Sequence, residues 1–185
     1  MLPKAAHAGL VSIIASIIVA TGLAGSAEAE VKSVAPNGFE VVDTVTVQAP
    51  PEQIYAALGK IGQWWSSAHT FSRDAANLSL DLKAGGCFCE RLKNGGSVQH
   101  LLVVYAAPGE GLRLRGALGP LQMEGVDGTL AWTLKPSEGG TIVTQSYVVG
   151  GYIRSGMDNW APKVDAVLHE QLDRVKRFVE AKPLD

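Results

Sequence analysis

The stretch VTVQAPPEQIYAAL, residues 45–58, contains the junction on which the fold depends. Val45 and Val47 alternate with polar residues, which is typical of a strand with one buried face. A proline pair then ends the strand, and Pro51 suits the first turn of a helix because no N–H donor is needed there. The stretch therefore predicts a strand over 39–48 that leads directly into a short amphipathic helix.

The rest of the chain predicts a meander followed by one long helix. Alternating segments separated by Gly, Asn and Pro turns are typical of antiparallel strands, and they cover 86–92, 97–105, 112–118, 129–135 and 141–149. A helix is predicted over 159–181, and its apolar face is formed by Val164, Leu168, Leu172, Val175 and Val179. This order predicts an α+β fold, with a curved antiparallel sheet wrapped around the C-terminal helix and a short helical pair after the first strand.

The N-terminus has the features of a signal peptide over residues 1–29. Lys4 precedes an apolar segment over 10–25, and Ala27-Glu28-Ala29 has the small-x-small form of a cleavage site. We therefore expect a mature protein that begins near Glu30, is periplasmic or secreted, and keeps no stable membrane span; an uncleaved signal anchor is the alternative. Residues 30–38 are predicted to be a polar lead-in, and residues 39–182 a single domain.

Composition and motifs argue against several classes of function. The formal net charge is −2 and charges of both signs are mixed along the chain, so no basic stripe predicts binding to nucleic acid. The sequence contains no nucleophile-elbow pattern, phosphate-binding glycine loop or dinucleotide fingerprint. No cofactor is predicted, and the sequence does not identify a protein partner.

The order of the elements resembles the START-related helix-grip superfamily of the birch-pollen allergen, also called SRPBCC. VTVQAPPEQIYAAL, the Trp64-Trp65 pair and the terminal helix carry this resemblance, which extends over 39–181. The stretches DAANLSLDLKAGGCFCERL, LRLRGALGPLQMEGVDGTLAWTL and YVVGGY are similar to a bacterial branch described as polyketide-cyclase-like or chaperone-ATPase-activator-like. The resemblance is specific for the fold, and the superfamily includes carriers, receptors and cyclases.

The resemblance implies a cavity for a small hydrophobic molecule between the sheet and the long helix. Its expected ligand-binding residues are Trp64, Trp65, Leu118, Leu121, Met123, Trp132, Tyr147, Tyr152, Trp160, Val164 and Leu168. The leading hypothesis is an exported carrier of a lipid, an isoprenoid or an aromatic polyketide-like molecule. The alternative is a cyclase or dehydratase that uses polar groups in the same cavity. A chaperone-activating module is a third hypothesis, and the signal peptide argues against it because that partner is cytosolic.

Three residues are weak candidates for acid–base catalysis. Asp43 shares the apolar phase of its strand, so it lies at an edge, pairs with a base or faces a wet cavity. Glu90 and His100 are the other two, because a polar cluster at the cavity is where a shifted pKa serves proton transfer.

Cys87, Cys89 and His100 allow several interpretations. A two-residue turn at Asn94-Gly95 would place Cys89 opposite His100, so that all three side chains project from one face as a possible zinc site. Cα atoms two apart on an extended strand are about 6.5 Å apart, so an unstrained disulfide requires a bulge. Free, partly buried cysteines are the favoured interpretation because cysteine commonly behaves as a small core residue. A disulfide or redox pair and a metal site are the alternatives.

Overall fold

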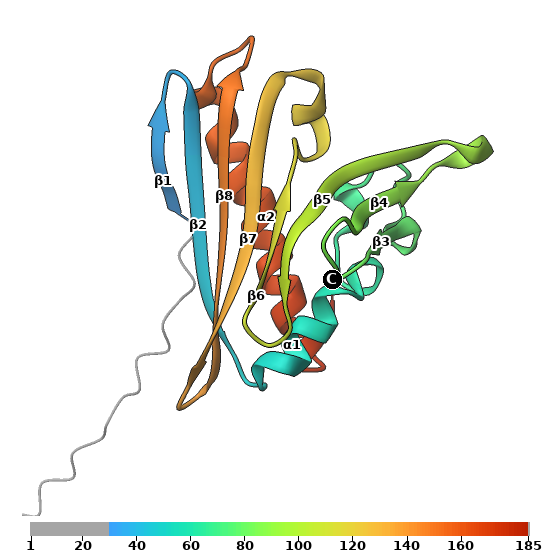
Figure 1. The fold of residues 1–185 in the computed structure, drawn as a ribbon, viewed down its shortest axis with the longest axis vertical. Helices are drawn as coiled ribbons and strands as arrows, with labels where there is room; N and C mark the ends of the chain where they lie inside the picture. Colours follow the sequence, from blue (N-terminus) through green and yellow to red (C-terminus); the bar gives the residue numbers. More distant parts are fainter. Residues whose placement is uncertain (1–29, 185) are drawn as a thin grey trace, which may run out of the picture.

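A computed structural model describes residues 30–184, in which an eight-stranded antiparallel sheet curls around one long helix (Figure 1). The strand order is β1-β2-β8-β7-β6-β5-β4-β3. The predicted α+β helix-grip fold is confirmed. The signal peptide predicted over 1–29 lies outside the described residues, and so does its cleavage site.

The strands and helices have the following bounds. The strands are β1 Glu30–Ala35, β2 Gly38–Val47, β3 Leu78–Leu80, β4 Cys87–Arg91, β5 Ser97–Ala107, β6 Gly111–Arg115, β7 Gly125–Ser137 and β8 Gly140–Tyr152. The helices are α1 Pro51–Leu58 and α2 Met157–Val179, with short 3₁₀ turns η1 Ile61–Gln63, η2 Ser67–His69, η3 Ala75–Asn77, η4 Lys93–Gly95 and η5 Gly119–Met123. None of the helices within residues 30–184 is long and apolar enough to cross a membrane.

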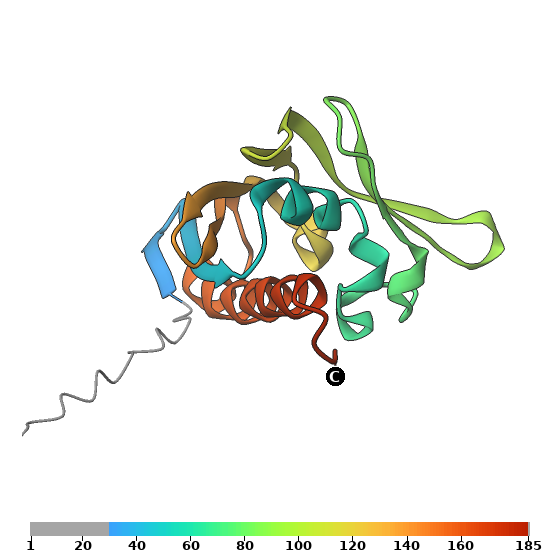
Figure 2. The ribbon, with the colours of Figure 1, turned by 90° about the horizontal axis from the view of Figure 1, so that it is seen from below.

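Helix α2 lies on the concave side of the sheet, as its apolar face predicts (Figure 2). Leu168, Leu172 and Val175 are buried at the centre of that face, and Val164 and Val179 are partly buried toward its ends. The buried side chain of Gln145 on β8 fixes the helix to the sheet by donating from Nε2 to the carbonyl of Leu168 at 2.9 Å.

Two strands were not predicted, and both are hard to recognise from periodicity. The segment expected to be a polar lead-in contains β1, which pairs with β2 at the edge of the sheet. Its Lys32 and Ser33 side chains are exposed, so an edge strand of this composition looks like a polar linker in sequence. Strand β3 has only three residues, which is too short to show a period.

The segment after α1 crosses from the helix to the far end of the sheet. Trp64 is fully buried, and its indole N–H donates to the carbonyl of Ala57 at 2.9 Å. Helix α2 holds the same segment, because Gln171 accepts from the backbone N–H of Ser66 at 2.8 Å and Arg174 donates to the carbonyl of Trp64 at 2.7 Å. In Figure 2 the β4–β5 part of the sheet extends away from α2, and this segment lies between them.

Candidate ligand cavity

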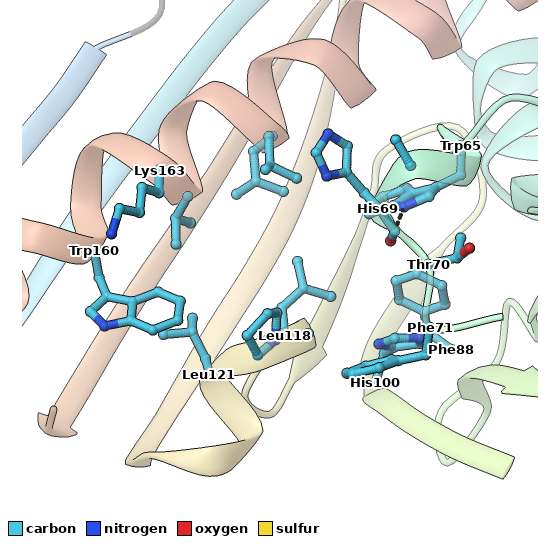
Figure 3. Close-up of a pocket in the computed structure, with 16 residues that line it drawn as sticks. Trp65, His69, Thr70, Phe71, Phe88, His100, Leu118, Leu121, Trp160 and Lys163 are labelled. Carbon is cyan, nitrogen blue, oxygen red and sulfur yellow. Dashed lines mark hydrogen bonds between the residues drawn. The ribbon is translucent and has the colours of Figure 1, made fainter. Parts of the chain in front are cut away.

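A cavity of about 490 Å³ lies where the β4–β5 part of the sheet diverges from α2 (Figure 3). Its walls come from α2, from the η5 loop, from the segment around η2 and from β4 and β5. The lining residues are Trp65, Ala68, His69, Thr70, Phe71, Phe88, His100, Leu118, Gly119, Pro120, Leu121, Trp160, Lys163, Val164, Val167 and Leu168. Most of these side chains are apolar, which is typical of a site for a small hydrophobic ligand.

The α2 wall follows from helical spacing. Trp160, Val164 and Leu168 recur every four residues and therefore share one side of the helix, and Val167 lies beside them. Figure 3 shows Trp160 and Lys163 at one end of the cavity, opposite Phe71, Phe88 and His100. The Lys163 ammonium lies 5.8 Å from the centre of the Trp160 ring, a distance at which cation–π attraction operates.

The η5 loop that lines one side is held in place from two directions. The buried hydroxyl of Tyr147 donates to the carbonyl of Gly116 and accepts from the backbone N–H of Leu118, each at 2.9 Å. After the turn, Arg154 donates to Glu124 through Nη2 at 2.9 Å and through its backbone N–H at 3.0 Å. Burial raises the pKa of the Tyr147 phenol, so this hydroxyl stays protonated and keeps its donor.

Aromatic rings form the wall opposite α2. His100 is stacked with Phe71 at 5.9 Å between ring centres, with 20° between the planes. Its ring centre lies 4.9 Å from that of Phe88, which in turn meets Trp65 edge-on at 5.4 Å. The Trp65 indole donates to the carbonyl of His69 at 3.2 Å, the dashed line in Figure 3. Packing on these rings fixes the orientation of the His100 imidazole.

A buried carboxylate stands behind this wall. Glu90 Oε2 lies 3.0 Å from His100 Nε2 and accepts from the backbone N–H of Phe71 at 3.1 Å, and Glu90 Oε1 accepts from the backbone N–H of Ser72. Burial raises the pKa of Glu90, but the hydrogen bonds from Ser72, Phe71 and His100 together outweigh burial and leave the pKa below its ordinary value. Glu90 is therefore ionised near neutral pH.

The imidazole of His100 is neutral under the same conditions. Burial lowers its pKa, and the hydrogen bond with Glu90 and that residue's charge offset the shift only in part. Because ionised Glu90 can only accept, Nε2 of His100 carries the proton and donates it. Nδ1 is then an acceptor, and it is buried with no hydrogen-bond partner within residues 30–184.

A second histidine lies at the edge of the cavity and is held by α2. His69 Nε2 lies 2.9 Å from Glu170 Oε2, and both side chains are partly exposed. This pair ties the η2 segment to the helix at the cavity rim.

The cavity includes some of the predicted ligand-binding residues and excludes others. Trp65, Leu118, Leu121, Trp160, Val164 and Leu168 line it. Trp64, Trp132 and Tyr147 are core residues whose polar atoms bond elsewhere in the protein, and Met123 and Tyr152 are exposed to solvent. Aromatic residues on alternating strands therefore serve as packing here more often than as cavity wall.

The three acid–base candidates are not brought together. His100 lines the cavity with Glu90 behind it, whereas Asp43 lies elsewhere, on β2, with Oδ1 3.2 Å from Nδ1 of His169. Burial raises the pKa of Asp43, and the hydrogen bond and charge of His169 lower it in part. Asp43 thus takes the expected alternative of a carboxylate paired with a base.

The predicted grouping of Cys87, Cys89 and His100 is wrong because the β4–β5 register contains a bulge. Cys87 pairs with Leu102 as predicted, but the register shifts between Phe88 and Cys89, and Cys89 pairs with Gln99. The extra residue, His100, joins Leu101 on the buried face with Glu90, while the cysteines lie on the opposite face. Among the described residues, no three His, Cys, Asp or Glu side chains are grouped so as to hold a metal ion.

The two cysteines form a disulfide, which corrects the favoured interpretation of free thiols. Their Cα atoms are 5.3 Å apart, which is less than the distance between residues i and i+2 of an extended strand. The register shift that separates His100 from the cysteines occurs at the same place. The extra residue of this bulge, His100, belongs to β5, whereas the disulfide joins two residues of β4, so the bulge lies opposite the disulfide.

Several cavity residues were missed by the sequence reasoning. Phe71 and Thr70 belong to a loop without periodicity, so only the aromatic character of Phe71 set it apart. Phe88 lies between the two cysteines in sequence, where an aromatic residue on a strand is typical of core packing. Val167 and Lys163 adjoin the predicted stripe on α2, and widening that stripe by one residue would have found Val167.

Fold and cavity together define a helix-grip protein with an apolar ligand-binding cavity. The model of the family described as "Polyketide cyclase / dehydrase and lipid transport" matches residues 38–180, so the chain belongs to this family. The predicted membership of the SRPBCC superfamily is thereby confirmed. A comparison with curated protein sequences gave no match.

Solved structures with the same fold come from several bacteria. Protein MLL2253 from Mesorhizobium loti is 15% identical, with 78% of this chain and 99% of that chain covered and a TM-score of 0.56. CalU16 from Micromonospora echinospora is 15% identical, with 86% and 87% covered and a TM-score of 0.56. SA2116 from Staphylococcus aureus, a protein of unknown function, is 17% identical, with 78% and 94% covered and a TM-score of 0.54. At these identities the likeness shows the fold alone.

Proposed function

We propose that this protein is an exported carrier that binds a small hydrophobic molecule in the cavity between α2 and the β4–β5 part of the sheet. The observation that carries the proposal is the cavity itself, about 490 Å³ and lined mainly by apolar and aromatic side chains. A space of this size holds a molecule of a few fused rings or a folded lipid chain. The family description, which includes lipid transport, supports the same class of ligand.

Export is inferred from the leader sequence. Lys4, the apolar segment over 10–25 and Ala27-Glu28-Ala29 form a signal peptide pattern. We propose that the mature chain begins near Glu30 and acts in the periplasm or outside the cell.

The first test is a native mass spectrum of the mature protein purified from its own exporting compartment, followed by a denatured spectrum of the same sample. We expect a native mass that exceeds the denatured mass by a few hundred daltons, because the carrier retains its ligand in the cavity. The denatured mass also fixes the cleavage site. A native mass equal to the denatured mass would count against a retained ligand.

The second test fills the cavity. Val164→Trp places a large ring at the α2 wall, and binding of the retained molecule should fall at least about tenfold with little loss of stability. Val148→Trp is the matched control, because Val148 is 50% exposed on β8 and lies outside the cavity. Equal binding by both variants would place the ligand elsewhere.

A second candidate function is a cyclase or dehydratase, and the His100–Glu90 pair is the observation that favours it. A neutral imidazole with a free acceptor nitrogen at the wall of an apolar cavity can accept a proton from a substrate, and Glu90 stabilises the resulting cation. His100→Gln keeps a donor toward Glu90 and removes the base. For an enzyme, turnover measured at saturating concentrations of the compound should fall by a factor of about 100 or more. For a carrier, the bound compound leaves chemically unchanged in both proteins.

A further inference from the structure

We infer that the ligand carries a neutral hydroxyl group, which donates a hydrogen bond to Nδ1 of His100 while the rest of the molecule occupies the apolar cavity. The inference rests on the proposed ligand-binding function and specifies its chemistry. It assigns the single polar recognition point on the aromatic wall, between Phe71 and Phe88.

The neighbours of His100 fix which of its ring nitrogens donates a hydrogen bond and which accepts one. Both amide groups that reach Glu90, from Phe71 and Ser72, are donors, so Glu90 acts as an acceptor for all its partners. Nε2 must therefore supply a proton across the 3.0 Å contact with Glu90. In the neutral ring this leaves the lone pair on Nδ1 as the one unused hydrogen-bonding position, so a partner must be a donor.

An unused acceptor at this position is costly in the empty protein. His100 is only 5% exposed, and Nδ1 has no partner within the described part of the chain. A buried polar atom without a hydrogen bond has lost its hydration without compensation, and a ligand donor at this atom removes that penalty. Binding is thereby biased toward molecules that bring a donor to this end of the cavity.

The charges around His100 select a neutral donor. A carboxylate or phosphate offers no proton to Nδ1, and it would lie near ionised Glu90, which stands behind the ring. An ammonium group would have to leave water for a wall formed by Phe71, Phe88 and Trp65. A phenol, enol or alcohol supplies the proton without carrying a charge into the cavity.

Phe71 is the exposed aromatic neighbour of His100 on this wall. Its ring stacks on His100, lines the cavity and is 52% exposed, so it can move toward solvent with little loss of buried area. Phe88, on the other hand, is 1% exposed and fixed in the core. Phe71 is therefore the neighbour of His100 that can shift at least cost to admit a ligand hydroxyl.

The test compares two probes that differ only at the hydroxyl, 1-hydroxypyrene and 1-methoxypyrene, by fluorescence titration of the mature protein at pH 7.5. We expect 1-hydroxypyrene to bind at least about tenfold more tightly, because only it can donate to Nδ1. Equal binding of the two probes would overturn the hydroxyl inference and leave the hydrophobic cavity intact. Binding of neither probe would overturn both.

Two variants of His100 assign the preference to the correct nitrogen. Gln at this position keeps a donor near Nε2 for Glu90 but has no acceptor where Nδ1 was. In His100→Gln the two probes should therefore bind about equally. Asn places its carbonyl oxygen near the Nδ1 position, so in His100→Asn a preference of several fold should persist. Loss of the preference in both variants, or in neither, would contradict the role of Nδ1. Circular dichroism of each variant checks that the comparison is between folded proteins.

Discussion

The hydroxyl of Tyr147, on the interior strand β8, accepts a hydrogen bond from the backbone N–H of Leu118 at 2.9 Å and so connects the core of the sheet to the wall of the cavity. Tyr147 is fully buried and does not line the cavity, whereas Leu118 does. The phenol also donates to the carbonyl of Gly116 at 2.9 Å. One core side chain thus positions the loop that leads into η5.

Tyr147→Phe is expected to loosen this loop without emptying the core. The variant loses both hydrogen bonds and keeps the ring, so the free energy of unfolding should fall by about 1–3 kcal/mol. Binding of 1-hydroxypyrene should weaken several fold because Leu118 is no longer held. Urea unfolding and fluorescence titration measure the two effects.

Thr141→Val is the control for that change. It removes a buried hydrogen bond, from the Thr141 hydroxyl to the carbonyl of Ala49 at 2.7 Å, keeps the shape of the side chain, and lies outside the cavity. It should cost similar stability and leave binding unchanged. A weakening of binding equal to that in Tyr147→Phe would show that general destabilisation is responsible.

Glu90→Gln should destabilise the protein strongly, although the two side chains are nearly the same size. The amide removes the charge and turns one acceptor into a donor facing the N–H groups of Phe71 and Ser72 or of His100. Loss of hydrogen bonds to a buried charged group predicts a fall of about 2–4 kcal/mol in the free energy of unfolding. Asp127→Asn, in an exposed pair with Arg115, should change it by less than about 1 kcal/mol. Similar effects in the two variants would contradict the importance assigned to burial.

Acidification below neutral pH should weaken the fold through His100. Its folded pKa is lowered, so between the ordinary histidine pKa of about 6.5 and that lower value only the unfolded chain is protonated. Unfolding then takes up a proton, and stability falls as pH falls through this window, by at most about 1.4 kcal/mol per pH unit. Glu90, whose folded pKa is also lowered, adds a loss in the same direction at more acidic pH.

The measurement is a series of urea unfolding curves from pH 8 to pH 5 for the wild type and for His100→Gln. The difference between the two series isolates His100, because Asp43, whose raised pKa acts in the opposite direction, is present in both. The wild type should lose more stability than the variant below about pH 6.5. Parallel curves would mean that His100 titrates normally in the folded protein.

The sequence predicted the fold well because long-range architecture follows from local periodicity. The strand-to-helix junction at Pro51 and the apolar face of α2 each fix an element with one buried side, and only a few arrangements bury all of them together. The α2 wall of the cavity was predicted from the family resemblance, and its residues Trp160, Val164 and Leu168 share a helical face.

The other wall could not be predicted because it depends on one irregular residue. The bulge moves His100 across the sheet from the cysteines to the side of Glu90, and a strict alternation places it on the wrong face. Phe71 reaches the cavity from a loop that only tertiary contacts define. The recognition point that we infer is therefore formed where periodicity fails.

The disulfide between Cys87 and Cys89 can be tested directly by mass spectrometry. The denatured mass of the untreated protein should be about 2 Da below that of the reduced protein, because Cys87 and Cys89 are joined. Since the bond closes only a very short loop, its loss in a Cys87→Ser, Cys89→Ser double variant should lower the free energy of unfolding by only about 1.5 kcal/mol.

Binding by the double variant should fall more than this small loss of stability suggests, because the register shift at Cys89 accompanies the placement of His100 beside Glu90. A several-fold loss of the preference for 1-hydroxypyrene over 1-methoxypyrene, with the protein still folded, would show that the disulfide supports the bulge. An unchanged preference would show that the packing of Phe71 and Phe88 on His100 holds the bulge without the disulfide.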